Sequence, residues 1–325
     1  MTGNRGSGPP LVSAIVINWN TRDHLNECLA SLLSGGGSPE LEVIAVDNNS
    51  PDGSAEMVRQ KFPSVMLIEN DRNLMFAGGV NSGLKQARGK YFFILNPDVL
   101  ITPDSIAKLA AFMEEHPDVA AASPALFYPG GEFQSEFFLR LPSFMQLFLY
   151  YTPLYSLARK STYLRSRYYE AALNRSADTD LDQLPGGCML VSRTAVEAAG
   201  PMDEDFVLYY EDVDWCTRLS QHGRLVLHPG VSAVHHGGGS HQKDESWVDG
   251  RFKTSMLLYF KKHLGPVSFR MASIVFFGIA RASLMLRSVE SFLPMFDQRR
   301  VANRIEKNKF FLQEYRQRQN AFAKY

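Results

Sequence analysis

The strongest constraint on the fold is an alternation of apolar, β-branched segments with helix-like segments over the first 125 residues. Continuous apolar runs are typical of strands buried in a parallel sheet, whereas apolar residues three and four apart indicate helices. The expected strands cover residues 11–18, 41–47, 65–70 and 91–96, and the expected helices cover residues 23–33, 54–62, 78–88 and 103–116. This order predicts an α/β fold with an open, mostly parallel sheet flanked by helices.

The composition is that of a folded soluble protein, with 45% hydrophobic and 21% charged residues. Residues 1–10 are small, polar and rich in Gly and Pro, so we expect them to be disordered. They lack the apolar run of a signal peptide, and we expect no export. The three cysteines are widely spaced and form no CxxC pair, which indicates neither a zinc site nor a disulfide framework. These features favour a cytoplasmic location.

The net charge of zero conceals a division of the chain. From Arg251 onward there are fifteen Lys/Arg and four Asp/Glu, a net of +11, so the first 250 residues carry −11. A basic segment suggests an anionic partner such as membrane lipid, a phospholipid-linked substrate or nucleic acid, the alternative being a solvated helical surface. Residues 266–286 are apolar and nearly long enough to span a bilayer, but Arg270 and Arg281 interrupt them. We therefore favour a helix lying on an anionic membrane surface and expect no nucleic acid partner.

The middle of the chain, about residues 125–185, is less regular, and residues 138–169 interleave aromatic side chains with Arg and Lys. That mixture is compatible with nucleic-acid binding, a membrane contact, a lid or an ordinary helical insertion. From Gly186 we expect a strand, a helix over residues 209–223 and a strand pair over residues 224–236. Beyond Glu245 the chain looks helical to its end.

Polar side chains follow three of the expected strands, in Asn18-Trp19-Asn20, Asp47-Asn48-Asn49 and Asn96-Pro97-Asp98. Ligands of parallel sheets bind beyond the carboxyl ends of the strands, so these tripeptides should converge on one rim. A divalent cation held between substrate phosphates needs only one or two protein carboxylates. Asp98 is therefore a candidate metal ligand, although Asn-Pro-Asp is also a common turn sequence.

The segment Glu211-Asp212-Val213-Asp214 crowds three carboxylates beside an aromatic run. Repulsion and partial burial both raise carboxylate pKa values, as a general base that takes a proton from a hydroxyl requires. Asp214 and Arg218 form an i,i+4 pair that looks structural. The alternative is a set of acids favoured at a helix N-terminus.

Two further segments are candidates for ligand binding. His235 precedes a glycine run and is suited either to a metal or diphosphate contact or to a structural role. Residues 73–83 carry glycines that let backbone N–H groups approach a ligand. No GxGxxG follows the first expected strand and no GK[ST] follows the glycines, which argues against a dinucleotide-dependent oxidoreductase and a Walker loop.

Taken in order, the segments VSAIVINWN, VDNNSPDGS, NLMFAGGVNSGL, ARGKYFFILNPDV, PGGCMLVSRTAVEAAGPMDEDFVLYYEDVDWCTR and HPGVSAVHHGGGS resemble the family-2 glycosyltransferases of GT-A fold, and most of all their rhamnosyltransferase-like branch. The resemblance covers residues 11 to about 241. It implies a Rossmann-like GT-A domain over residues 11–244, with a nucleotide-sugar half (11–125) and an acceptor half (126–244). Residues 245–325 would then be a basic helical, membrane-associated extension.

The resemblance also implies roles for individual residues. Asp212 would be the general base, with Glu211 beside it, and Asp98 and His235 would bind Mg²⁺ or Mn²⁺. The residues implied in donor binding are Trp19, Asn20, Asp47, Asn49, Asn73, Gly79, Asn81 and Asn96. Two positions depart from the family pattern. Asn96 replaces the first Asp of the metal-binding DxD motif, and Met75 stands where the branch often has Gly.

The implied activity is an inverting, metal-dependent sugar transfer from a nucleotide-diphosphate donor to a hydroxyl of a glycan or polyprenyl-linked acceptor in cell-envelope polysaccharide synthesis. The leading donor is dTDP-rhamnose, from the branch resemblance alone, and the expected site of action is the inner face of the cell membrane. The alternative is a non-catalytic, membrane-surface sugar-binding protein that keeps the fold. The sequence does not predict an oligomeric state.

Overall fold

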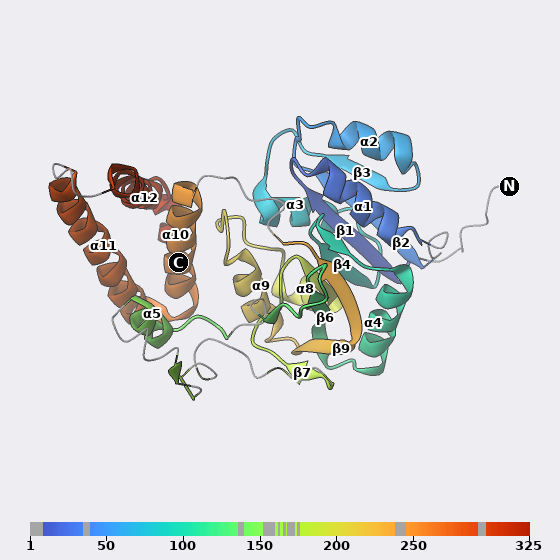
Figure 1. Ribbon diagram of the computed structural model, residues 1–325. Coiled ribbons are helices and arrows are strands. Elements are labelled where there is room, and N and C mark those ends of the chain that lie inside the picture. The colour runs from blue at the N-terminus through green and yellow to red at the C-terminus, as the bar shows by residue number, and fades with distance from the viewer. Residues whose placement is uncertain are drawn as a thin grey trace. The chain divides into compact units, whose positions relative to one another are not determined.

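The computed structural model describes residues 9–34, 40–135, 140–151, 160–161, 163–164, 167, 173, 176–237, 245–291 and 297–325. The chain divides into two compact units (Figure 1). The first unit comprises Met1–Leu141, Glu170–Asp203 and Asp212–His241, and the second comprises Pro142–Tyr169, Glu204–Glu211 and Gln242–Tyr325. The second unit thus takes in two segments that precede the helical extension. The expected disorder of residues 1–10 falls mostly outside the described residues.

In the described part of the chain the first unit contains a single nine-stranded sheet. Its strands are β1 (Val12–Asn18), β2 (Leu41–Asp47), β3 (Met66–Glu69), β4 (Tyr91–Leu95), β5 (Val99–Leu100), β6 (Val119–Phe127), β7 (Thr179–Asp180), β8 (Cys188–Ser192) and β9 (Arg224–His235). They lie in the order β3-β2-β1-β4-β8-β6-β9-β5, and β7 pairs with β9.

The four strands predicted from the first 96 residues form the parallel half of this sheet. β1 pairs in parallel with β2 and β4, and β2 pairs in parallel with β3. The other half is mixed, because β8 runs antiparallel to β4 and β6, whereas β6 and β9 are parallel. The expected strand pair at residues 224–236 is a single strand, β9, whose register against β6 shifts midway.

The helices of the first unit connect these strands and cover the sheet. They are α1 (Arg22–Leu32), α2 (Ser54–Lys61), α3 (Met75–Leu84), α4 (Pro103–Glu115), α8 (Arg193–Ala199) and, from Asp212 onward, α9 (Glu211–Leu219). The crossovers through α1 and α2 advance in one direction along the sheet and the crossover through α3 returns in the other. Right-handed crossovers therefore place α3 on the face opposite α1 and α2.

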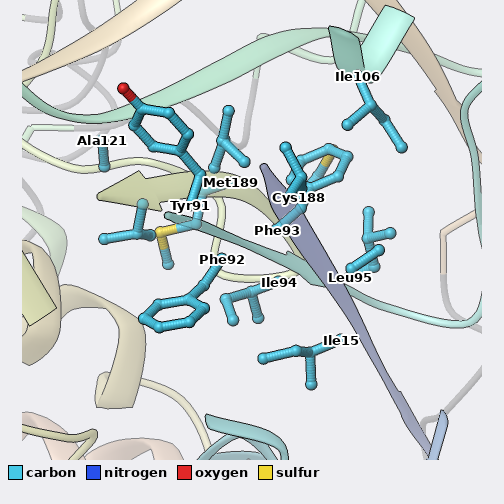
Figure 2. Packing of buried hydrophobic residues seen from close by; sticks show 14 of the residues in the cluster. Ile15, Tyr91, Phe92, Phe93, Ile94, Leu95, Ile106, Ala121, Cys188 and Met189 are labelled. Atoms are coloured by element: carbon cyan, nitrogen blue, oxygen red, sulfur yellow. The ribbon is translucent and has the colours of Figure 1, made fainter. Parts of the chain in front are cut away.

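The core is centred on β4, all five of whose side chains are buried. Phe93 and Leu95 point to one face of the sheet while Phe92 and Ile94 point to the other, where Ile15 of β1 meets them (Figure 2). Burial on both faces explains why these strands have continuous rather than alternating apolar sequences. Each such side chain contributes on the order of 2 kcal/mol to folding through removal from water.

The described part of the second unit is helical, as predicted for the C-terminal region. It contains α5 (Phe144–Tyr151), α10 (Glu245–His263), α11 (Gly265–Glu290), α12 (Gln298–Gln317) and α13 (Gln319–Ala323). Helices α10, α11 and α12 pack on one another. The segment Glu204–Glu211 belongs to this unit because α10 holds it. The Ser255 hydroxyl donates to the Leu208 carbonyl at 2.9 Å, and the ring of Phe252 contacts Tyr209 and Tyr210.

Candidate active site

The predicted rim exists where β1 and β2 end side by side. Asn18 and Asp47 are paired in the sheet register, and the Asn18 amide donates to the Asp47 carboxylate at 2.7 Å. The other Asp47 oxygen accepts from the Ser50 N–H at 2.9 Å, and the Thr21 hydroxyl donates to Asn18 at 2.7 Å. Asp47 is buried, so this carboxylate organises the loop after β2 as well as being a candidate donor ligand.

The loop after β1 is held to the same structure. The Asn20 N–H donates to the Ser50 hydroxyl at 2.9 Å, and Asn20 has the left-handed backbone (φ 55°) that Asn tolerates. Trp19 is half-buried and Asn20 is exposed. Asn49 is also exposed and left-handed, with φ 60°. These three predicted donor-binding residues therefore lie on the solvent side of the Asp47 network.

Asn48, the middle residue of the predicted rim tripeptide Asp47-Asn48-Asn49, connects this rim to α3. It is buried, donates to the Met75 carbonyl at 3.0 Å and accepts from the Asn70 amide at 2.7 Å. A β-carbon on Gly79 would lie 2.7 Å from Ile17 Cγ2 and 3.1 Å from Asn48 Nδ2. Gly79 is thus required for the close packing of α3 on β1, apart from any donor contact.

The start of α3 is a turn in which Met75 has φ 60°. A left-handed backbone is uncommon for a long side chain and costs on the order of 1 kcal/mol, whereas Gly adopts it freely. The left-handed backbone therefore explains why the family often has Gly at this position. The turn is held by the Asn73 side chain, which accepts from the Met75 N–H at 2.8 Å. Asn73 is only half-buried and lies beside the rim.

Asn81 lies deeper in the fold than its predicted role implies. Its amide nitrogen donates to the Met202 carbonyl at 2.9 Å and its amide oxygen accepts from the Met202 N–H at 3.0 Å. Asn81 is 5% exposed and ties α3 to a segment 121 residues later in the chain. Its contact with a donor stays a prediction.

The two predicted metal ligands do come together. Pairing of β5 with β9 places Val99 opposite His235, and the Asp98 carbonyl accepts from the His236 N–H at 3.0 Å. As a result Asp98 Oδ1 lies 3.5 Å from His235 Nε2, and both side chains are buried. The glycine run that follows His235 lies outside the described residues from Gly238 on.

A fully buried glutamine, which the sequence pattern did not predict as a site residue, orients His235. The Gln134 amide nitrogen donates to the His235 carbonyl at 2.8 Å, which turns its oxygen toward His235 Nδ1, also at 2.8 Å. Because that oxygen can only accept, Nδ1 carries the hydrogen, and Nε2 is the ring nitrogen that faces Asp98. Histidine ligands of metals are commonly held in this way by a hydrogen bond to the other ring nitrogen.

This donor set fits a divalent cation that shares its coordination with substrate. Asp98 and His235 offer one carboxylate and one imidazole, and the described residues contain no group of three or more His, Cys, Asp or Glu that would form a closed protein site. Mg²⁺ and similar ions often keep water and substrate phosphates as their remaining ligands. Asn96 stands in place of a second carboxylate, which is compatible with an ion that takes its remaining ligands from water and substrate phosphates.

Two adjacent glycines bring Asp212 to this rim. Because β8 runs antiparallel to β4, its first residue lies beside Leu95, and the Gly187 carbonyl accepts from the Asn96 N–H at 2.8 Å. A β-carbon on Gly187 would lie 2.3 Å from the Asn96 amide, and one on Gly186 would lie 2.5 Å from the β-carbon of Asp212. The dipeptide therefore packs against both Asn96 and Asp212, and no larger residue fits in either position.

The environment of Asp212 suits a general base. Burial raises the pKa of Asp212, and the effect outweighs the lowering by hydrogen bonds from the N–H groups of Val213 (2.9 Å) and Gly186 (3.3 Å). The preceding residue, Glu211, is 7% exposed and is the last residue of its segment in the second unit. Thus only Asp212 of the predicted pair belongs to the unit that carries the rim.

Asp214 has the structural role predicted for it. Its buried carboxylate accepts from Arg218 Nε at 3.0 Å and Arg218 Nη2 at 2.8 Å. The Arg218 guanidinium also donates to the Ala199 carbonyl at 2.5 Å, and the Trp215 indole donates to the Gly200 carbonyl at 3.0 Å. These bonds fix α9 and so fix the position of Asp212 at its start.

The fold is the GT-A fold of glycosyltransferases. The sequence matches the family described as Glycosyl transferase family 2 over residues 13–200, more than half of the chain, and the chain belongs to that family. Among relatives, the N-acetylglucosaminyl-diphospho-decaprenol L-rhamnosyltransferase of Mycobacterium tuberculosis is 26% identical over 270 residues, covering 78% of this chain and 86% of that protein. The O-antigen biosynthesis protein RfbC of Myxococcus xanthus is 26% identical over 241 residues, covering 73% of this chain and 18% of that protein.

Solved structures show the same fold at low sequence identity. A mannosyltransferase of Pyrobaculum calidifontis in complex with GDP-Man and Mn²⁺ is 18% identical, with a TM-score of 0.53 over 95% of this chain and 88% of that chain. Residues 1–349 of TarS from S. aureus are 16% identical, with a TM-score of 0.54 over 94% of this chain and 91% of that chain.

Proposed function

We propose that the protein transfers a sugar from a nucleotide-diphosphate donor to an acceptor hydroxyl with inversion at the anomeric carbon. The observation that carries this proposal is the Gly186-Gly187 dipeptide, which packs against Asp212 on one side and against Asn96 of the rim on the other. A carboxylate of raised pKa thereby lies in the same unit and along the same sheet edge as the Asp98–His235 pair.

Asp98 and His235 would hold the divalent cation, Mg²⁺ or Mn²⁺, which when bound neutralises charge on the leaving diphosphate. The Asn18–Asp47–Ser50 network lies at the neighbouring strand ends and supports the loops that carry Trp19 and Asn20. We assign this part of the rim to the nucleoside of the donor, with Asn49 and Asn73 at its edge.

Asp212 accepts the proton of the acceptor hydroxyl as that oxygen attacks the anomeric carbon. The new glycosidic bond forms while the bond from the anomeric carbon to the diphosphate oxygen breaks, and the nucleoside diphosphate leaves with the bonding electrons. A single displacement inverts the configuration and requires no covalent bond to the protein. The raised pKa of Asp212 matches the need of a base that must take up a proton during the reaction.

For substrates we propose dTDP-rhamnose as the donor and a polyprenyl-diphosphate-linked glycan of the cell envelope as the acceptor, used at the inner face of the membrane. The support is the relative from Mycobacterium tuberculosis, whose name describes rhamnosyl transfer to a decaprenol-linked sugar. The alternative is a sugar-binding protein that keeps the fold without turnover.

Donor binding is tested by the melting temperature of the purified protein with dTDP-rhamnose, other nucleotide sugars and dTDP, each with Mn²⁺ or with EDTA. The proposal predicts a rise with dTDP-rhamnose that requires the metal and is lost in Asp98→Ala. Release of dTDP on addition of a lipid-linked acceptor then distinguishes the enzyme from the sugar-binding alternative. A metal-independent shift that survives in Asp98→Ala would contradict the assigned donor site.

A further inference from the structure

Helix α11 has two opposite apolar faces, of which one is packed. Its inner face contains Ala272, Phe276 and Ala280, all buried, and packs on α12. The rings of Phe276 and Phe277 lie 6.0 and 5.4 Å from that of Phe311, and the Asn308 amide donates to the Ser283 hydroxyl at 3.1 Å. These contacts fix the rotation of α11 about its own axis.

The outer face of α11 consists of Val267, Met271, Ile274, Met285 and Val289. Successive members are four, three, eleven and four residues apart, which places them all on one side of a helix with 3.6 residues per turn. They are between 43% and 75% exposed, so five large apolar side chains project into solvent along the length of the helix. A soluble surface rarely carries so long an apolar stripe without a partner.

By length and composition α11 is apolar enough to cross a bilayer, with a mean hydropathy of 1.5 over its best 18 residues, of which 17% are buried. Its neighbours argue against crossing. Helix α12, on which the inner face packs, carries six Lys/Arg and two Asp/Glu within 20 residues. Arg270 and Arg281 of α11 are themselves exposed. Taking these charges into hydrocarbon would cost several kcal/mol.

The charge of the region identifies the partner that suits this face. From Arg251 onward the chain carries a net +11, and Arg270 and Arg281 lie along one border of the outer face by helical spacing. An apolar stripe bordered by long cationic side chains is typical of helices lying in the interface of an anionic bilayer, where Arg reaches the headgroups. Helix α5 packs against α11 and adds two more exposed apolar side chains, Met145 and Phe148.

We propose that the outer face of α11 is a membrane-docking surface that lies flat in the headgroup region of an anionic phospholipid bilayer, without crossing it. The apolar side chains enter the boundary between headgroups and acyl chains, and the basic residues of the same unit bind the lipid phosphates. The proposal is independent of the transfer reaction, since it involves none of the rim residues.

Vesicle sedimentation tests the surface. The full-length protein is mixed with phosphatidylcholine vesicles with and without phosphatidylglycerol, at low and high salt. Binding should require the anionic lipid and weaken with salt. Ile274→Glu and Met285→Glu should each weaken it by about tenfold or more, because a side chain of this size loses its transfer from water. Met66→Glu, a matched change at an exposed Met of β3 in the first unit, should have no effect.

Depth measurements test the orientation. The three native cysteines are buried, so Val267→Cys and Met285→Cys can be labelled singly with a fluorophore. The two positions lie roughly 27 Å apart along the helix. A flat helix predicts that quenchers carried by lipids of the outer leaflet reach both labels at the same shallow depth, whereas a spanning helix places the two labels in opposite leaflets, so that these quenchers reach only one of them. Failure to bind anionic vesicles, or an outer face that proves to be a dimer contact when Ile274→Glu changes the mass in solution, would overturn the proposal.

Discussion

Gly186 lies so close to Asp212 that a β-carbon on the glycine would be 2.5 Å from the β-carbon of the aspartate and 3.0 Å from its Oδ2 oxygen. The same glycine donates its N–H to that oxygen at 3.3 Å. The backbone before β8 thus both makes room for the candidate base and bonds to it. This contact aligns the carboxylate of α9 with the edge of the sheet.

Gly186→Ala should therefore displace Asp212 and lower kcat by about a hundredfold, since misplacing a catalytic group by about 1 Å costs that much. Gly130→Ala is the matched control, because a β-carbon there meets nothing within 4 Å and kcat should be unchanged. Both variants are compared by kcat and by melting temperature. Equal kcat in the two variants would show that the close contact has no catalytic consequence.

Gln134→Leu should weaken metal binding without removing either ligand. Loss of the hydrogen bond to His235 Nδ1 frees the ring to rotate and to change its tautomer. The Mn²⁺ concentration needed for half-maximal binding of dTDP should rise by about 10 to 100-fold. Gln60→Leu, at an exposed position of α2, controls for the change of residue type. An unchanged Mn²⁺ requirement in the folded Gln134→Leu variant would show that the glutamine does not contribute to metal binding.

The raised pKa of Asp212 also predicts a pH dependence of stability. At low pH, below the ordinary Asp pKa of about 4, both folded and unfolded states hold the proton. As the pH rises the unfolded chain ionises first, so stability is lost until the pH passes the higher folded-state pKa. Asp212→Asn cannot ionise, and it should melt above the parent protein at neutral pH and match it near pH 4.

The control for this measurement is Asp71→Asn, which removes an exposed carboxylate from a loop. Its melting temperature should follow that of the parent protein at every pH. A melting temperature of Asp212→Asn that is equal to or below the parent's at neutral pH would contradict the raised pKa of Asp212.

The parallel half of the sheet could be predicted because β1, β2 and β4 are largely buried and have continuous apolar sequences, and because the edge strand β3 follows at the same strand–helix spacing. β6 could not, since its sequence VAAASPALF combines small residues with a proline. Pro124 is tolerated there because the register against β9 shifts between Pro124 and Ala125, interrupting the ladder. The same register shift explains why the sequence of the single strand β9 predicted a pair of strands.

The candidate metal ligands and the acidic segment could be predicted because carboxylates and a histidine at strand and helix ends are chemically conspicuous. The residues that position them could not. Gln134 and Gly186 act through tertiary contacts with residues 101 and 26 positions away, and no local pattern encodes such contacts. Met75 departs from the family pattern, and its positive φ explains why Gly is frequent at this position in the family.

The central claim is that Asp212 is the base of the transfer reaction, and the most direct test is kcat measured alongside the donor Kd for Asp212→Asn, Glu211→Gln and Asp214→Asn. Asp212→Asn keeps the shape of the side chain, so kcat should fall by about 10² to 10⁴ while the donor Kd changes little. Asp214→Asn breaks a buried ion pair with Arg218 and should cost roughly 3 kcal/mol of stability instead. Near-normal kcat in Asp212→Asn, with a collapse of kcat in Glu211→Gln, would contradict the assignment.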